Sequence, residues 1–392
     1  MGLTDTLKYQ IEYSVNMVLS SGVNVELTSY VESRYELRLD KSKITRLFTS
    51  MRPAYTEAEE HFVQKYLMCD EMVAQGMAQD GYGNCLIKVQ NADGSDSKTL
   101  WSCHTDSVHR KSGVQEVHFD PLTDKFSTPD GSCLGADDNS GTYILLELLR
   151  KRIPGLYIFH RAEEVGGCGS SWIAQHSSEL LEQYDRAIAF DRKDIYSIIT
   201  HQGSKRCCSD EFADDLAEKL GMNHRTDSGG SFTDTANYDH IIPECTNLSV
   251  GYFNAHSARE TQLLDYLWQL KDAFANMDCE SLVTHRNPDA PVEYSSGGYY
   301  GYGDTLLKPH KAARSAMGWS KSDDIKWKED TKSRKDTKSI SDEVILDEVI
   351  LDEILDEDYG PKATKGKHSL NIKDKDEPTE DSWRDFFGQI SD

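Results

Sequence analysis

The 392-residue sequence has no long apolar segment. No run approaches the roughly 20 apolar residues that a membrane-spanning helix needs, and no cationic stretch followed by an apolar core opens the chain. We therefore expect neither a membrane span nor a secretory signal.

Positive charge is also scarce, with 43 Lys and Arg against 67 Asp and Glu and a formal net charge of −24. This charge disfavours binding to nucleic-acid phosphates or to anionic membranes.

Paired cysteine motifs are absent as well. The nine cysteines form no Cys-X-X-Cys pair, and a chain of this length does not depend on disulfide bonds for stability. We therefore expect reduced thiols and a cytoplasmic location.

Residues 46–280 alternate between apolar strand-like runs and amphipathic helical runs. Strands are predicted at 84–89, 99–103, 155–160, 186–190, 196–200 and 246–253, and helices at 140–152, 170–184 and 257–277. Turn residues within 117–131 predict a hairpin, and Thr56 followed by Glu59 resembles a helix capping box. Continuous apolar strands with helices between them are typical of a mainly parallel sheet covered on both faces. We predict a three-layer α/β/α sandwich.

The two flanking regions differ from this domain. Residues 1–45 show mixed helical periodicity without recognisable chemistry and are treated as an extension of unknown role. Residues 281–392 are rich in Lys, Asp and Ser, and the five-residue repeat in "SDEVILDEVILDEILDED" matches neither a helix nor a strand period. We expect a largely disordered acidic tail. The alternative is a docking segment for an unidentified protein, helped by an apolar stripe at Trp383, Phe386, Phe387 and Ile390.

Five separate segments bring acidic or histidine side chains to the ends of predicted strands or the start of a helix. They are His104 with Asp106, Asp137 with Asp138, Glu163 with Glu164, Asp191, and His256. Open α/β sheets place their ligand crevices at the carboxyl ends of the strands. One such residue alone is usually a helix cap or an ordinary histidine. Five segments together would gather carboxylates that repel one another unless cations are present.

Two divalent cations would balance this charge. Asp137, Glu164 and Asp191 contribute three negative charges and a metal-bound hydroxide a fourth, while His104 and His256 are neutral ligands. The mixed imidazole and carboxylate set suits zinc, with cobalt or manganese as substitutes.

The segments "CHTDSVH", "LGADDNSG", "AEEVGGCG", "AFDRKD" and "YFNAHSARE" together resemble the motifs of the co-catalytic zinc exopeptidases, the clan of the M20, M28 and M42 metallopeptidases. The resemblance covers about residues 45–280 and implies two zinc ions in a phosphorylase/hydrolase-like fold. It places His104 and Asp191 on one ion, Glu164 and His256 on the other, and Asp137 between them. Asp106 would orient His104, and Glu163 would be the general base. The Asp137–Asp138 peptide bond is often cis in this clan.

The spacing of the motifs bears on the subfamily. Only 64 residues lie between Asp191 and His256, and 32 lie between His104 and Asp137, which leaves no room for the lid of M20 enzymes or the inserted domain of M42 enzymes. The layout is closest to a lidless, single-domain M28-like enzyme. The residues of "LGADD" and "NAHSARE" also resemble the corresponding motifs of M20 tripeptidases.

The resemblance implies hydrolysis of short peptides by a di-metal-bound hydroxide, with Glu163 passing the proton to the leaving amine. An aminopeptidase is the leading interpretation. A carboxypeptidase or an N-acyl amino acid amidohydrolase would use the same site. The non-enzymatic alternative is a binding module that acts through the acidic tail.

One further loop, "TDSGGSFTDTANY", resembles the clan's substrate-binding loop. Its candidate substrate-binding residues are Ser231, Thr233, Asp234 and Asn237. The alternative is a glycine-rich connector followed by a helix cap, since loops carry binding but also simply connect. The sequence leaves the oligomeric state open.

Overall fold

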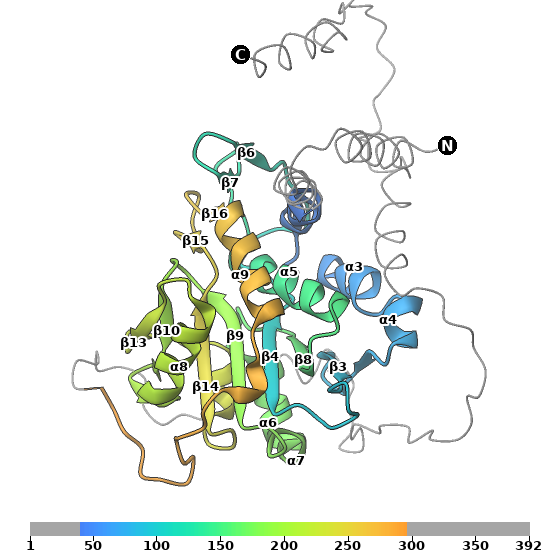
Figure 1. The fold of residues 1–392 in the computed structure, drawn as a ribbon. Coiled ribbons are helices and arrows are strands. Elements are labelled where there is room, and N and C mark those ends of the chain that lie inside the picture. The colour runs from blue at the N-terminus through green and yellow to red at the C-terminus, as the bar shows by residue number, and fades with distance from the viewer. Residues whose placement is uncertain (1–39, 296–392) are drawn as a thin grey trace, which may run out of the picture. The chain divides into compact units, whose positions relative to one another are not determined.

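The computed structural model describes residues 40–295, and the statements that follow refer to this range (Figure 1). The predictions for residues 1–39 and for the acidic tail beyond 295, including its five-residue repeat and its apolar stripe, lie outside the described residues. The domain boundaries predicted near residues 45 and 280 stay predictions.

An eight-stranded sheet forms the centre of the fold, in the order β13-β10-β14-β9-β4-β8-β3-β2. Its four middle strands β14, β9, β4 and β8 are mutually parallel, and antiparallel pairs join β3 and β10 to them. The mainly parallel sheet predicted from the sequence is therefore confirmed. The strands are β2 (Ala78–Gln79), β3 (Cys85–Val89), β4 (Thr99–His104), β8 (Gly155–His160), β9 (Arg186–Arg192), β10 (Ser197–Ile199), β13 (Arg225–Asp227) and β14 (Glu244–Ser249).

The middle strands are apolar along their whole length because both of their faces are buried. Successive side chains of a strand point to opposite faces of the sheet. In β4, Leu100 belongs to one hydrophobic cluster and Trp101 to the other, and in β8 Ile158 and Tyr157 divide in the same way. Each of these side chains is at most 2% exposed. Burial of a large apolar side chain stabilises the fold by roughly 1.5–3 kcal/mol.

Helices cover both faces of the sheet and complete the predicted three-layer α/β/α sandwich. Figure 1 shows α5 and α9 lying over the middle strands. The cluster on this face draws on α3 (Glu57–Tyr66), α4 (Asp70–Ala74), α5 (Ala136–Arg150), α8 (Asp210–Leu220) and α9 (Leu264–Asn276). The cluster on the other face draws on α6 (Cys168–His176), α7 (Ser178–Leu181) and η1 (Asp234–Tyr238).

Two helices predicted from the sequence differ in the structure. The prediction of one helix over 257–277 is wrong at its start, because Gln262 lies in a short strand and its side chain binds the carbonyl of Val250 and the hydroxyl of Ser140. The prediction of one helix over 170–184 is also wrong, because the backbone leaves the helical region at Ser177 and separates α6 from α7.

The smaller strands complete the fold around the central sheet. The hairpin predicted within 117–131 is confirmed by β6 and β7, and Thr56 caps α3 through the N–H of Glu59 as predicted. These strands are β1 (Ser50–Met51), β5 (Gly113–Val114), β6 (His118–Asp120), β7 (Lys125–Ser127), β11 (His201–Gln202), β12 (Lys205–Arg206), β15 (Tyr252–Phe253) and β16 (Thr261–Leu263).

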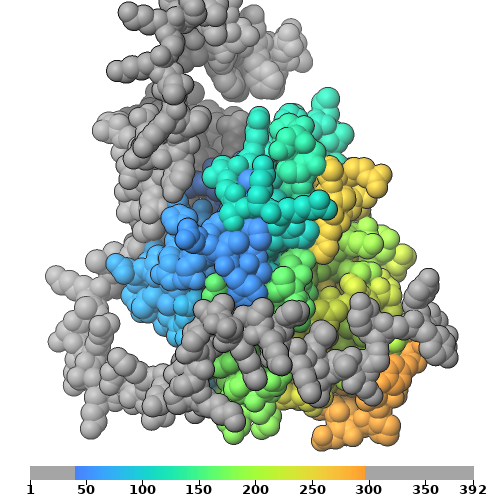
Figure 2. All heavy atoms as spheres, turned by 180° about the vertical axis from the view of Figure 1, so that it is seen from behind, coloured from blue at the N-terminus to red at the C-terminus, as the bar shows by residue number. Residues whose placement is uncertain are grey.

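The two ends of the described range pack onto the sandwich. Lys271 of α9 forms a buried ion pair with Asp40 at 2.7 Å. After η2 (Cys279–Ser281), Arg286 donates to the carbonyls of Asp239 and Ile242. Figure 2 shows early (blue), middle (green) and late (yellow and orange) parts of the chain adjoining on one face. Within residues 40–295, no helix has the length and apolar character needed to span a bilayer.

Candidate metal centre

Side chains from five segments meet at one edge of the central sheet. His104 ends β4, Asp191 lies near the end of β9, and Glu164 lies in the loop that follows β8. Because these three strands are parallel, their carboxyl ends meet at the same edge. Asp137 reaches this edge from the start of α5, and His256 reaches it from the turn after β15.

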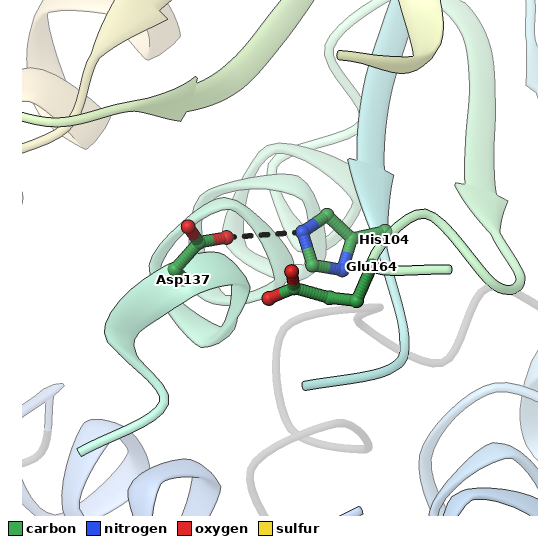
Figure 3. A group of neighbouring side chains, drawn as sticks. All are labelled: His104, Asp137 and Glu164. Atoms are coloured by element: carbon green, nitrogen blue, oxygen red, sulfur yellow. Dashed lines mark hydrogen bonds and ion pairs between the residues drawn. The ribbon is translucent and has the colours of Figure 1, made fainter. Parts of the chain in front are cut away.

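Asp137 lies at the middle of the group. Its Oδ1 is 3.1 Å from Nε2 of His104, and its Oδ2 is 3.0 Å from Nε2 of His256. Nε2 of His256 is also 3.2 Å from Oε2 of Glu164, and Nε2 of His104 is 3.9 Å from Oδ1 of Asp191. Figure 3 shows Asp137 pointing toward His104 with Glu164 beside them. The structure therefore brings together all five side chains that the sequence predicted as ligands.

Four of these residues and their neighbour Asp138 form two overlapping groups that could each hold a metal ion. In each group the candidate ligand atoms lie within 4.8 Å of one another, and His104 belongs to both. The groups are His104, Asp137 and Glu164, and His104, Asp138 and Asp191.

Asp106 holds three of the surrounding groups in place. Its carbonyl oxygen lies 3.0 Å from Nδ1 of His104 and its Oδ1 lies 3.3 Å from the same nitrogen, which leaves Nε2 to face the cluster. Its two carboxylate oxygens also accept the backbone N–H groups of Glu163 and Glu164, each at 3.1 Å. Asp106 therefore fixes an imidazole and the two neighbouring glutamates at once.

Asp191 is also held by hydrogen bonds, from residues that the sequence analysis did not identify as its partners. The hydroxyl of Thr233 donates to Oδ2 at 2.7 Å, and the hydroxyl of Tyr252 donates to Oδ1 at 3.1 Å. The side chain of Asn247 pairs with the backbone of Asp191 through both its amide nitrogen and its oxygen.

Asp138 also has a larger part than the sequence suggested. Its Oδ2 accepts the N–H of His104 at 3.2 Å and its Oδ1 accepts the N–H of Gly141 at 2.9 Å. It therefore joins the end of β4 to the start of α5. The adjacent pair of aspartates was the only signal in the sequence, and the peptide bond between Asp137 and Asp138 is cis.

The electrostatics of the cluster are those of a site with surplus negative charge. Burial raises the pKa of the Glu163 and Asp191 carboxyls well above their usual range. Burial alone would also raise the pKa of Asp137, but hydrogen bonds from His104 and His256 lower it below its ordinary value. Hydrogen bonds to Asp137 and Glu164 raise the pKa of His256 to about 11.

One buried carboxylate oxygen in the cluster tests whether these donors fit a metal ion. Oε1 of Glu164 is buried and has no hydrogen-bond partner among the described residues. A buried carboxylate oxygen without a donor is costly. A divalent cation would satisfy it, and the donor set of imidazoles and carboxylates is one that zinc accepts. The residues present therefore fit the metal ions that the sequence predicted.

The four candidate substrate-binding residues lie in different surroundings. Ser231 is exposed, whereas Thr233 is buried against Asp191. Asp234 is also buried, with Oδ2 3.4 Å from Nδ1 of His160 and with Oδ1 lacking a hydrogen-bond partner among the described residues. Asn237 is half-buried and donates to the carbonyl of Gly167 and the hydroxyl of Ser170. Contact of these residues with substrate stays a prediction.

Comparison with known proteins shows a similarity of fold. No protein-family model matches the sequence, and no curated protein matches it significantly. A tripeptidase from Staphylococcus aureus aligns with a TM-score of 0.50 and 14% identity over 61% of this chain and 96% of that chain. An aminopeptidase from Desulfurococcus kamchatkensis aligns with a TM-score of 0.48 and 15% identity over 63% of this chain and 96% of that one. The described chain therefore has the same fold as the staphylococcal tripeptidase.

Proposed function

We propose that this protein is a metal-dependent exopeptidase, most simply an aminopeptidase with two zinc ions that acts on short peptides. The observation that carries the proposal is the position of Asp137, whose two oxygens face His104 and His256 at about equal distance. A carboxylate shared between two imidazoles, with a further carboxylate beside each, is a donor arrangement for two adjacent cations. Cobalt or manganese could replace zinc in the same site.

Each donor has a proposed part in this site. His104 and Asp191 would hold one ion, Glu164 and His256 the other, and Asp137 would contact both. When bound, the two cations would polarise the scissile carbonyl and activate a water molecule.

Glu163 would take the proton from that water and deliver it to the leaving amine. Asp106 accepts the backbone N–H groups of both Glu163 and Glu164, and these two hydrogen bonds hold the Glu163 backbone in place beside the predicted ligand. Glu163 and Glu164 lie in the bend and turn that follow β8, where Glu164 would bind metal while Glu163 transfers the proton.

The charges around the site support an aminopeptidase over a carboxypeptidase. A carboxypeptidase needs a cation to receive the terminal carboxylate of the peptide. Two of the nearby arginines are already engaged, since Arg161 pairs with Glu59 and Glu60 and Arg192 lies near Asp227. Arg52 is fully buried, and Arg259, three residues after His256, is exposed. The remaining acidic surplus favours a substrate that presents an α-ammonium group.

The chain between Asp191 and His256 supports the single-domain, M28-like interpretation. It supplies β10, β13 and β14 to the central sheet, so this stretch is part of the sandwich.

The nine cysteines all lie in the described range and are all free, which supports the proposed cytoplasmic compartment.

A peptide panel with a general-base variant tests the proposal. We expect the zinc-loaded full chain to cleave dipeptides and tripeptides that have a free amino terminus. The Glu163→Ala variant should lose about 100- to 10,000-fold in kcat while it keeps its bound zinc. Glu179→Ala, an exposed change on α7, serves as the matched control and should behave as wild type.

Three outcomes would count against the proposal. Peptide hydrolysis that survives Glu163→Ala would remove the proposed general base. Efficient cleavage of substrates with a blocked amino terminus would favour the carboxypeptidase or the N-acyl amino acid amidohydrolase. A protein without bound metal or hydrolytic activity would favour the binding module that acts through its tail.

A further inference from the structure

Glu260 is a buried carboxylate next to the predicted metal centre that has no part in the mechanism above. It lies four residues after His256, immediately before β16, and is 1% exposed. Its side chain faces the start of α5, where Gly135 occupies the N-cap position and has no side chain to offer to the backbone. Asp138 accepts the N–H of Gly141 within the same helix, but the N–H groups of Gly135 and Asp137 take their acceptor from a segment more than a hundred residues away.

The carboxylate of Glu260 binds two backbone groups on either side of Ala136. Oε2 accepts the N–H of Gly135 at 2.8 Å, and Oε1 accepts the N–H of Asp137 at 3.1 Å. The thiol of Cys133 donates to Oε2 at 2.6 Å. These contacts satisfy buried donors that would otherwise lack an acceptor.

These hydrogen bonds have a geometric consequence for Asp137. Its N–H is anchored by Glu260, while its carboxylate lies between His104 and His256. Glu260 and His256 belong to the same short segment, so one side chain sets the distance between that segment and the start of α5. A second link, from Ser140 to Gln262, strengthens this connection.

We propose that Glu260 is a positioning residue that sets the Asp137 carboxylate between the two histidines and thereby raises the affinity of the site for divalent metal. The proposal rests on the proposed function, because it concerns the same metal centre. The competing explanation is a purely structural helix cap, whose loss would lower the stability of the fold and leave metal binding unchanged.

Cobalt titration of the full chain separates these two explanations. The Glu260→Gln variant keeps the shape of the side chain but offers one acceptor oxygen instead of two. We expect its cobalt affinity to fall about 10- to 100-fold, with an altered visible absorption spectrum of the bound cobalt. Ser209→Ala is the matched control, because Ser209 caps α8 through the N–H of Phe212 and its other side-chain bond goes to Glu244, which is not a predicted ligand. This control should lower the melting temperature without changing cobalt affinity or spectrum.

An unchanged cobalt affinity and spectrum in Glu260→Gln, together with a melting temperature lowered as in the control, would overturn the proposal. Should Glu260→Gln fail to fold, Glu260→Asp keeps the charge but is too short to reach both N–H groups, and it should also bind cobalt more weakly. The titration uses no peptide. Wild-type protein that binds cobalt but cleaves no peptide would refute the proposed function alone, whereas wild-type protein that binds no cobalt would refute both.

Discussion

The two ends of the donor cluster differ in how firmly the protein holds them. At one end, His104 has no exposed side-chain surface, and Asp191 accepts hydrogen bonds from Thr233 and Tyr252. At the other end, the side chain of His256 is 51% exposed. Oε1 of its neighbour Glu164 has no hydrogen-bond partner among residues 40–295.

This contrast separates a prearranged half of the site from an open half. Donors that are already held in place lose little freedom when a ligand binds, so they bind it more tightly. An exposed imidazole on a turn has to be ordered by the ion itself. We therefore expect a tightly bound metal at the His104 end and an exchangeable metal at the His256 end, where substrate and solvent have access.

Removing one histidine from each end should give the largest effects. His104→Ala should lose the tightly bound metal and lower kcat/KM by about 1,000-fold, equivalent to about 4 kcal/mol. His256→Ala should keep one metal per chain and lose only the exchangeable one. Metal content after gel filtration, measured by mass spectrometry beside the peptide assay, checks both. Equal metal loss in the two variants would erase the predicted difference between the ends.

Chelation of the wild-type protein should show the same contrast as a difference in the rates at which the two metals are released. We expect dialysis against a chelator to remove metal in two phases, with peptide hydrolysis lost by the end of the first. Adding back one equivalent of zinc per chain should restore most of the activity after the first phase, since the tightly bound metal is still present. A single phase in both metal content and activity would show that the two positions are equivalent.

A smaller effect is expected from the support behind Asp191. Thr233→Val removes the hydroxyl that donates to this carboxylate at 2.7 Å, so we expect about 1 kcal/mol lower stability and about tenfold weaker metal binding. Thr123→Val is the matched control, because the exposed Thr123 makes the same kind of bond to Asp120 at 2.7 Å. Denaturant unfolding and metal titration measure the two effects. If Thr233→Val binds metal as tightly as wild type does, Thr233 does not contribute to the prearranged half of the site.

Truncation after Ser295 should have the smallest effect. All the residues that make up both ends of the cluster lie in the described range 40–295, so we expect kcat/KM and metal content to stay within about twofold of wild type, a barrier change below 0.5 kcal/mol. The same truncated chain can be tested for loss of a binding partner. A tenfold loss of activity would give the predicted acidic tail a part in the site.

The ends of the predicted strands indicated where acidic and histidine side chains gather, and the resemblance to zinc exopeptidases implied which five of them are ligands. His104, Glu164 and Asp191 follow or end apolar strands, and parallel strands finish at the same edge of a sheet. That regularity needs no knowledge of side-chain orientation, so it could be predicted from the pattern of apolar residues. The three-layer architecture follows from the same pattern, since strands that are apolar throughout need cover on both faces.

The hydrogen bonds that hold the ligands in place could not be predicted from the ends of strands. Glu260 fell inside a predicted helix, and its actual contacts join it to Gly135 and Asp137 across more than a hundred residues of sequence. Thr233 was predicted to face substrate, and its contact with Asp191 depends on how a loop folds back over β9. Such contacts are set by tertiary packing of irregular segments, for which local periodicity gives no signal.

Anomalous diffraction from crystals of the zinc-loaded protein tests the central claim most directly. We expect two zinc peaks, one contacted by His104, Asp137 and Asp191 and the other by Asp137, Glu164 and His256. The peak at the buried end should have the higher occupancy. A map with no peak among these five side chains, or with zinc only at a distant surface site, would contradict the two-metal centre and the function proposed from it.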